Sequence, residues 1–175
     1  MPIKDMLLSF KGRIRRRDWW LWYIAATVII FVVYWLGTTI FLGSSKAAFD
    51  TFAQRTNESL LIESIVTIPL TFVICALSAK RAHDRNMLAW PFVAIVIANT
   101  VTNFIPGFVE GLVALQDGHI WQILILVLHI AALIGSLYSL VVLGFMDGTP
   151  GPNRFGRSPK GIGGDTAQAT AEVFE

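Results

Sequence analysis

Four long apolar stretches dominate the pattern of hydrophobic and polar positions along this chain. They cover about residues 19–42, 59–79, 87–109 and 120–146, and short polar segments separate them. A helix rises about 1.5 Å per residue, so about 20 apolar residues are enough to cross a hydrocarbon core of about 30 Å. The pattern therefore predicts an all-α membrane protein with four transmembrane helices in a bundle.

A shorter amphipathic pattern precedes the first apolar stretch. Ile3, Met6 and Phe10 recur at helical spacing, with charged residues between them. Amphipathic segments of this kind lie in the plane of the membrane interface. We therefore expect a short interfacial helix at the N-terminus, as the opening of a single membrane domain over residues 1–161. The polar, Gly-containing residues 162–175 are expected to form a disordered tail.

The composition agrees with a membrane location. The chain has 175 residues, of which 54% are hydrophobic and only 15% charged, whereas soluble domains carry about 25% charged residues. The first apolar stretch is too long for the core of a cleavable signal peptide, so we expect it to remain as an anchor. The single cysteine, Cys75, excludes an internal disulfide.

The positive charges are distributed unevenly along the chain. Of the 14 Lys and Arg residues, all but Lys46 and Arg55 lie in the N-terminal segment, the turn around residues 80–86 or the C-terminal segment. Cytoplasmic segments of membrane proteins carry the excess of Lys and Arg. The distribution therefore predicts that both termini and this turn are cytoplasmic.

Three charged motifs carry a resemblance to a known family. They are residues 10–20 (FKGRIRRRDWW), 79–84 (AKRAHD) and 148–159 (GTPGPNRFGRSP). Their order and spacing resemble the small bacterial inner-membrane proteins grouped as domain-of-unknown-function family 805. The resemblance implies a location in the bacterial inner membrane and a four-helix shape, and it implies no particular activity. Lys80 and Ala82 stand where that family usually has Arg and Leu.

The sequence contains few arrangements that carry catalytic chemistry. His83 and Asp84 invite a metal or catalytic interpretation, but a metal site needs about three or four ligands and only Asp18 and Asp147 are near candidates. Nucleophilic catalysis needs an activated Ser or Cys beside a base, and we find no motif that supplies one. We therefore expect no enzyme activity, no metal and no cofactor. The basic run 13–17 adjoins an apolar stretch, so we expect membrane anchoring and no nucleic-acid binding.

The charged segments on the cytoplasmic side predict one polar surface with Asp84 at its centre. A carboxylate among many guanidinium groups stays ionised and pairs, and the expected partners are Arg13 or Arg16 and Arg154. In a purely structural alternative, Asp84 caps the next helix or pairs with an N-terminal Arg, and His83 makes a hydrogen bond. Surplus cations would face anionic lipid headgroups or a partner, each adding about 1 kcal/mol of attraction to an anionic leaflet. The residues assigned to this surface are Arg13, Arg16, Arg81, His83, Asp84, Asn153 and Arg154.

Polar residues within the apolar stretches support an alternative function, a small transporter or channel subunit. Such residues commonly face the bundle interior and mark function, although hydrogen bonding between helices explains them equally simply. Small residues at spacing four, Ala131, Gly135 and Ser139, predict close packing of the last helix. Membrane lipids are the expected partners, and a homo-oligomer is compatible with the sequence. The assigned intramembrane cluster is Glu63, Asn99, Asn103 and His129.

Overall fold

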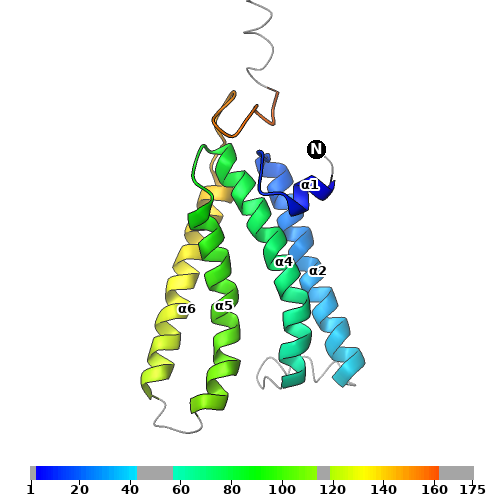
Figure 1. The fold of residues 1–175 in the computed structure, drawn as a ribbon, viewed down its shortest axis with the longest axis vertical. Helices are drawn as coiled ribbons and strands as arrows, with labels where there is room; N and C mark the ends of the chain where they lie inside the picture. The colour runs from blue at the N-terminus through cyan, green and yellow to red at the C-terminus, as the bar shows by residue number, and fades with distance from the viewer. Residues whose placement is uncertain (1–2, 43–56, 114–118, 162–175) are drawn as a thin grey trace, which may run out of the picture.

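The computed structural model of the protein describes residues 3–42, 57–113 and 119–161, and these residues are predominantly helical. Four long helices form the body of the structure (Figure 1): α2 (Arg16–Leu42), α4 (Asn57–Asp84), α5 (Trp90–Val113) and α6 (His119–Ser139). A short helix, α1 (Ile3–Leu8), precedes them, and a π-helical segment, η1 (Leu140–Phe145), continues α6. The predicted all-α class is therefore confirmed, whereas the predicted disordered tail, 162–175, lies outside the described residues.

Three of the described helices are long and apolar enough to cross a membrane, judged by length and composition. These segments are Arg16–Gly37, Ser64–Asp84 and Ile123–Phe145. In α5, the described apolar segment Trp90–Thr102 is shorter. The structure thus indicates a membrane protein, and the fourth crossing is a proposal.

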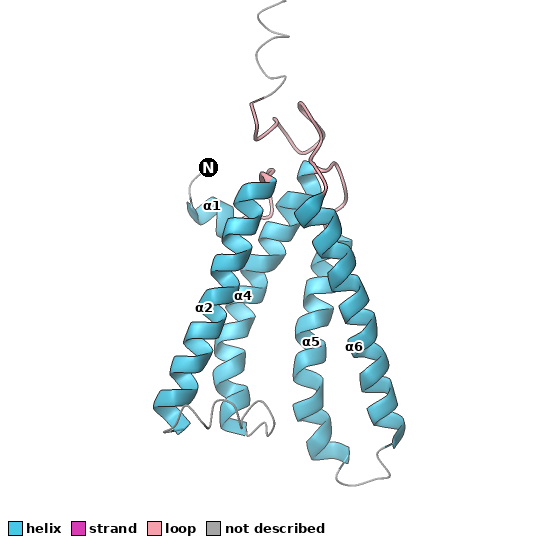
Figure 2. Cartoon of the chain, turned by 180° about the vertical axis from the view of Figure 1, so that it is seen from behind, coloured by secondary structure: helices cyan, strands magenta, loops and turns pink. Residues whose placement is uncertain are grey.

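The long helices form two antiparallel hairpins, α2 with α4 and α5 with α6, which converge at one end of the molecule (Figures 1 and 2). This end contains α1, the beginning of α2, the end of α4 and η1, and we call it the basic end because the described Lys and Arg residues gather there. The helix α4 is central, since it packs against α1, α2, α5 and η1. The basic end is therefore where the described helices converge.

The turn between α4 and α5 begins later than the sequence predicts. We expected the second helix to end near residue 79 and the third to begin at Met87. Instead α4 continues to Asp84, and α5 begins only at Trp90. The charged residues from Lys80 onward therefore belong to the last turns of a helix, which holds their side chains in fixed directions.

The reason for the later end is a Schellman motif centred on Asn86. Its φ of 58° is left-handed, a conformation that Asn tolerates better than most residues. The Asn86 N–H donates to the His83 carbonyl at 3.0 Å, and the Met87 N–H donates to the Ala82 carbonyl at 2.9 Å. These bonds satisfy carbonyls that would otherwise lack partners at the end of α4 and turn the chain towards α5.

Buried side chains concentrate at the basic end. Further along α2 and α6, large apolar side chains such as Phe31, Ile40 and Leu133 are exposed. Lipid tails cover such side chains as well as protein does, so this exposure is what a membrane protein requires. The buried apolar cluster comprises Ile14, Trp19, Leu77, Ala82, Phe92, Val142 and Leu143.

Candidate functional site

Asp84 is the centre of a buried group that we call the charge cluster, formed by Arg13, Arg81 and Asp84. Its Oδ1 lies 3.0 Å from Arg13 Nη2 and accepts a hydrogen bond from Arg13 Nε at 3.1 Å. Its Oδ2 accepts a short hydrogen bond from Arg81 Nη1, one helical turn earlier. All three side chains are at most 4% exposed. Buried charges need partners, and here one carboxylate holds two guanidinium groups inside the protein.

Arg13 uses its remaining donors to hold the C-terminal segment. Its Nη1 donates to the carbonyls of Gly151 at 2.8 Å and Gly156 at 3.1 Å, and its Nη2 donates to the Thr149 carbonyl at 2.8 Å. A guanidinium group presents five N–H donors in a planar fork, which suits it to bind several carbonyls at once. Arg13 thereby fastens the loop after η1 to the segment before α2.

Arg81 binds the C-terminal end of η1. Its Nε donates to the Leu143 carbonyl at 2.8 Å and its Nη2 to the Met146 carbonyl at 2.6 Å. Carbonyls at a helix C-terminus lack backbone partners and carry partial negative charge, so cations are favourable there. Three further side chains complete the set: Arg85 donates to Val142, Trp20 to Gly144 and Arg16 to Phe145. Each of the five carbonyls from 142 to 146 thus accepts a hydrogen bond from a side chain.

Lys80 performs the same task for α1. Its side chain is fully buried, and its Nζ donates to the carbonyl of Asp5 at 2.9 Å and to that of Met6. These carbonyls belong to the last turn of α1. The Asp5 carbonyl also accepts a hydrogen bond from the Ser9 N–H at 3.3 Å, so Lys80 adds a second donor there. Lys80 was not among the residues assigned to the polar surface. Its place directly before Arg81 in the charged motif was the only feature of the sequence that could have suggested a role for it.

His83 and Asn153 connect the C-terminal loop to the end of α4. His83 Nδ1 lies 3.2 Å from the Gly12 carbonyl oxygen, and the imidazole stacks on the Phe155 ring with centroids 3.9 Å apart. Asn153 Nδ2 donates to the His83 carbonyl at 2.9 Å, while its Oδ1 accepts from the Phe155 N–H. This local turn folds the loop back over the charge cluster. Within the described residues, no three His, Cys, Asp or Glu side chains gather as a metal site.

Of the two alternatives expected for the N-terminal partner of Asp84, Arg13 is the one found, and the expected contact with Arg154 is wrong. Arg16 instead lies 3.4 Å from Asp147, and Arg154 donates to the Asn86 carbonyl at 3.0 Å and lies over the Phe155 ring. The second partner of Asp84 is Arg81, which precedes it by three residues on the same helix face. The three-residue spacing of Arg81 and Asp84 was visible in the sequence. We expected a loop there, however, and residues three apart share a face only in a helix.

The expected polar surface is therefore buried at its centre. Arg13, Arg81 and Asp84 lie inside the protein, and the C-terminal loop covers them. Gly148 permits this close cover, since a Cβ atom there would lie 1.8 Å from Asp84 Oδ2. Sequence reasoning did not assign a role to Gly148, and only the packing shows why the position excludes a side chain.

Of the predicted intramembrane cluster, the structure describes the side chains of Asn99 and His129. Asn99 lines a pocket between the helices, whereas His129 does not line it and has its Nδ1 2.8 Å from the Ile125 carbonyl oxygen of its own helix. The side chains of Glu63 and Asn103 lie outside the described part of the structure.

Comparison with known proteins places this architecture in a family. Residues 7–157 match the family described as "Protein of unknown function (DUF805)". The chain is also similar to "Uncharacterized protein YiiR" of Escherichia coli K12, with 29% identity over 166 residues and 93% of each chain covered. The protein of the same name from Escherichia coli O157:H7 is similar to the same extent. No solved structure matches this chain.

The family match covers the structural features that organise the basic end. It includes the charge cluster, the Schellman turn after α4, all four long helices and η1. The resemblance seen in the three charged motifs is therefore confirmed, and this chain belongs to the DUF805 family of proteins of unknown function.

Proposed function

We propose that this chain is a four-span inner-membrane protein whose basic end faces the cytoplasm and binds anionic lipid headgroups. The observation that carries the proposal is the charge asymmetry along the bundle axis. In the described ranges, every Lys and Arg lies at the basic end, and the opposite ends of the four long helices hold none. Such an asymmetry is the usual mark of the cytoplasmic side of a membrane protein.

The fourth crossing is supported by the dimensions and placement of α5. This helix has 24 residues, which at about 1.5 Å per residue gives about 36 Å, more than the roughly 30 Å of a hydrocarbon core. It also runs antiparallel beside α6 over most of its length (Figure 1). A helix paired in this way with a membrane-spanning neighbour shares its depth in the bilayer.

Apart from the half-buried Arg85, the described basic side chains fall into an inner and an outer layer, and the outer layer suits lipid binding. Lys80, Arg13 and Arg81 are buried and engaged with backbone and Asp84. In the described residues the outer layer shares its surface with three acids, Asp5, Asp18 and Asp147, and Asp18 lies 3.6 Å from Arg17. Exposed cations near an anionic leaflet each contribute about 1 kcal/mol of attraction. The outer layer consists of Lys4, Lys11, Arg15, Arg16, Arg17, Arg154, Arg157 and Lys160.

Reporter fusions test the proposed orientation. Fusions within residues 46–55 and 111–118 are expected to report an external location, and a fusion after Lys160 is expected to report the cytoplasm. A fusion after Asn86 in the turn between α4 and α5 serves as the internal control and is expected to agree with the one after Lys160. An external signal after Lys160 would overturn the topology.

Native mass spectrometry from mixed-lipid nanodiscs tests the proposed ligand. The triple variant Lys11→Gln, Arg17→Gln, Arg157→Gln removes three exposed charges and leaves the charge cluster intact. We expect several-fold less enrichment of phosphatidylglycerol over phosphatidylethanolamine on this variant, because the attraction scales with the number of cations. The charge-preserving triple Lys11→Arg, Arg17→Lys, Arg157→Lys is the matched control. Equal enrichment on the Gln variant and on the control would refute lipid binding by the outer layer.

A further inference from the structure

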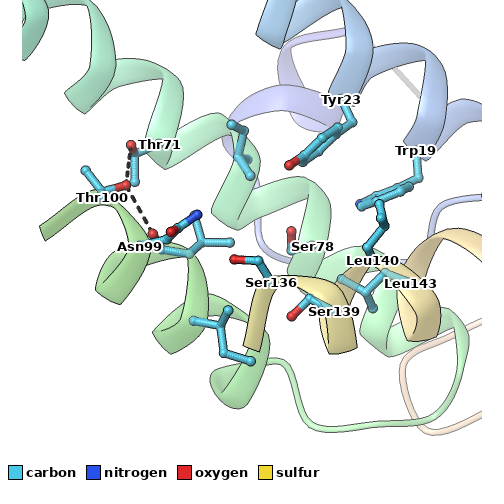
Figure 3. Close-up of a pocket in the computed structure, with 13 residues that line it drawn as sticks. Trp19, Tyr23, Thr71, Ser78, Asn99, Thr100, Ser136, Ser139, Leu140 and Leu143 are labelled. Atoms are coloured by element: carbon cyan, nitrogen blue, oxygen red, sulfur yellow. Dashed lines mark hydrogen bonds between the residues drawn. The ribbon is translucent and has the colours of Figure 1, made fainter. Parts of the chain in front are cut away.

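A pocket of about 120 Å³ lies between the long helices, and the beginning of α2 and η1 at the basic end form part of its lining (Figure 3). Its wall is formed by α2, α4, α5, α6 and η1, so it lies where all the long helices meet. None of its lining residues is charged. They are Trp19, Tyr23, Thr71, Ile74, Ser78, Ile95, Val96, Asn99, Thr100, Ser136, Ser139, Leu140 and Leu143.

Two polar atoms buried at this pocket have no hydrogen-bond partner among the described residues. They are Trp19 Nε1 and Ser139 Oγ, and Trp19 is only 2% exposed. The neighbouring indole differs, since Trp20 Nε1 donates to the Gly144 carbonyl at 2.9 Å. A buried polar group without a partner costs free energy, so a bound molecule that pairs with these two groups would stabilise this part of the protein.

The rest of the lining favours a neutral ligand with several hydroxyl groups. Ser136 and Tyr23 surround the same space in Figure 3, and Tyr23 stacks on Trp19 with ring centroids 5.0 Å apart. Farther from the basic end along α4 and α5, the hydroxyls of Thr71 and Thr100 pair with each other at 3.0 Å. The lining therefore offers hydroxyl groups from α2, α4, α5 and α6 with aromatic rings beside them, which matches the mixed polar and apolar surface of a small polyol.

The end of the pocket nearest the charge cluster is formed by η1, through Leu140 and Leu143. Segments of π-helix inside α-helices occur frequently at functional sites. The Leu143 carbonyl accepts from Arg81, so the charge cluster holds this end of the pocket in place. The pocket is therefore built on the most firmly connected part of the molecule.

We propose that this pocket binds a small neutral polyol, with Trp19 Nε1 donating to one ligand oxygen and Ser139 Oγ pairing with another. An ionic ligand is disfavoured, because the lining offers it no counter-charge. The volume of about 120 Å³ is well above the roughly 10–15 Å³ that a cavity needs to hold one water molecule, so the pocket has room for a small polyol. The site is separate from the lipid-binding surface proposed above, and the experiments below test it independently of that surface.

Indole N–H resonances of the ¹⁵N-labelled protein in detergent micelles test this site directly. The chain has 6 Trp residues, and a Trp19→Phe variant assigns the Trp19 signal. Titration with glycerol, the probe, is expected to shift the Trp19 signal saturably and to leave the other indoles nearly unchanged. Glycerol 3-phosphate, the charged comparator, is expected to produce no saturable shift. A shift that stays linear with glycerol, or that affects all indoles alike, overturns the proposal.

Two variants and a control locate the binding. Ser136→Leu fills the pocket, and we expect at least a tenfold weaker affinity for glycerol. Ala131→Leu makes a comparable change at an exposed position of the same helix and is expected to leave the affinity unchanged. Ser139→Ala preserves the volume and removes one partner, so an intermediate loss of affinity is expected even if Ser136→Leu disturbs folding. Unchanged affinity in Ser139→Ala, or an equal loss in Ala131→Leu, overturns the assignment.

Discussion

The helices α2 and α4 are similar in length, yet they have very different surroundings. They contain 27 and 28 residues, and their candidate spans have mean hydropathies of 1.9 and 1.6. The less apolar α4 is the more buried: every residue from 75 to 82 is buried, whereas most of α2 is exposed. Burial in this protein therefore does not follow hydropathy.

The reason is that, in the location we propose, lipid surrounds these helices in place of water. Lipid covers the apolar side chains of α2 as favourably as protein would, so nothing drives them inside. The polar groups at the end of α4 need partners that lipid tails cannot supply, and these groups gather protein around them. In water the apolar helix would take the interior, and here the helix that carries Lys80, Arg81 and Asp84 takes it instead.

The largest expected effect comes from breaking the charge cluster at the end of α4. Asp84→Asn leaves Arg13 and Arg81 buried without a counter-charge, and removal of one partner from a buried ion pair costs about 3–5 kcal/mol. We expect a loss of that order in the free energy of unfolding, measured by denaturant titration in detergent. The C-terminal loop should also loosen, which limited proteolysis of inverted vesicles would detect as faster cleavage near Arg154 and Arg157.

Asp147→Asn is the matched control for this change. It removes a carboxylate whose side chain is 71% exposed and whose partner, Arg16, is also exposed. Exposed pairs contribute about 0–1 kcal/mol, so stability and cleavage should stay near wild type. Equal losses in the two variants would show that the buried cluster is no more important than a surface pair.

The next effect compares apolar side chains on the two helices. Leu77 on α4 is fully buried, and Leu77→Ala is expected to cost about 2–5 kcal/mol because it leaves a cavity. Ile29 on α2 is 51% exposed, and Ile29→Ala should cost less than about 1 kcal/mol because lipid fills the space. Thermal unfolding of both variants in nanodiscs measures the difference. A cost at Ile29 that matches the cost at Leu77 would place α2 inside a larger assembly.

The smallest expected effect compares two glycines. In Gly148→Ala the new Cβ would lie 1.8 Å from Asp84 Oδ2. We expect this overpacking to lower the free energy of unfolding by about 1–3 kcal/mol and to loosen the binding of the C-terminal loop. In Gly135→Ala on α6 the new Cβ would lie 3.3 Å from the Ile95 side chain, a contact that a small shift relieves. Since Ala is also favoured over Gly in helices by about 1 kcal/mol, the net change should be near zero. Unfolding titrations of both variants test this, and similar values would contradict the close fit at Gly148.

The charged contacts show how far local reasoning reaches. Pairing of Asp84 with Arg13 follows from one carboxylate lying among many guanidinium groups, and the structure contains that pair. The Asp84–Arg81 pair was missed because helix was expected to stop near residue 79, and the left-handed conformation of Asn86 sets the true end. The end of a helix at an αL residue depends on the φ angle of that residue, and a hydropathy pattern carries no information about that angle.

The sequence alone determined the helical class, the approximate extent of the apolar helices and the gathering of cations in three segments, because periodicity and charge are local properties of the chain. Only the tertiary structure decided which charges are buried, that five successive carbonyls of η1 and its end accept side-chain hydrogen bonds, and that Trp19 and Ser139 share a pocket. Those outcomes depend on side chains that lie more than 50 residues apart in the chain and meet only when helices pack. Burial and hydrogen bonding of that kind are properties of the assembled bundle, and no single segment contains the partners.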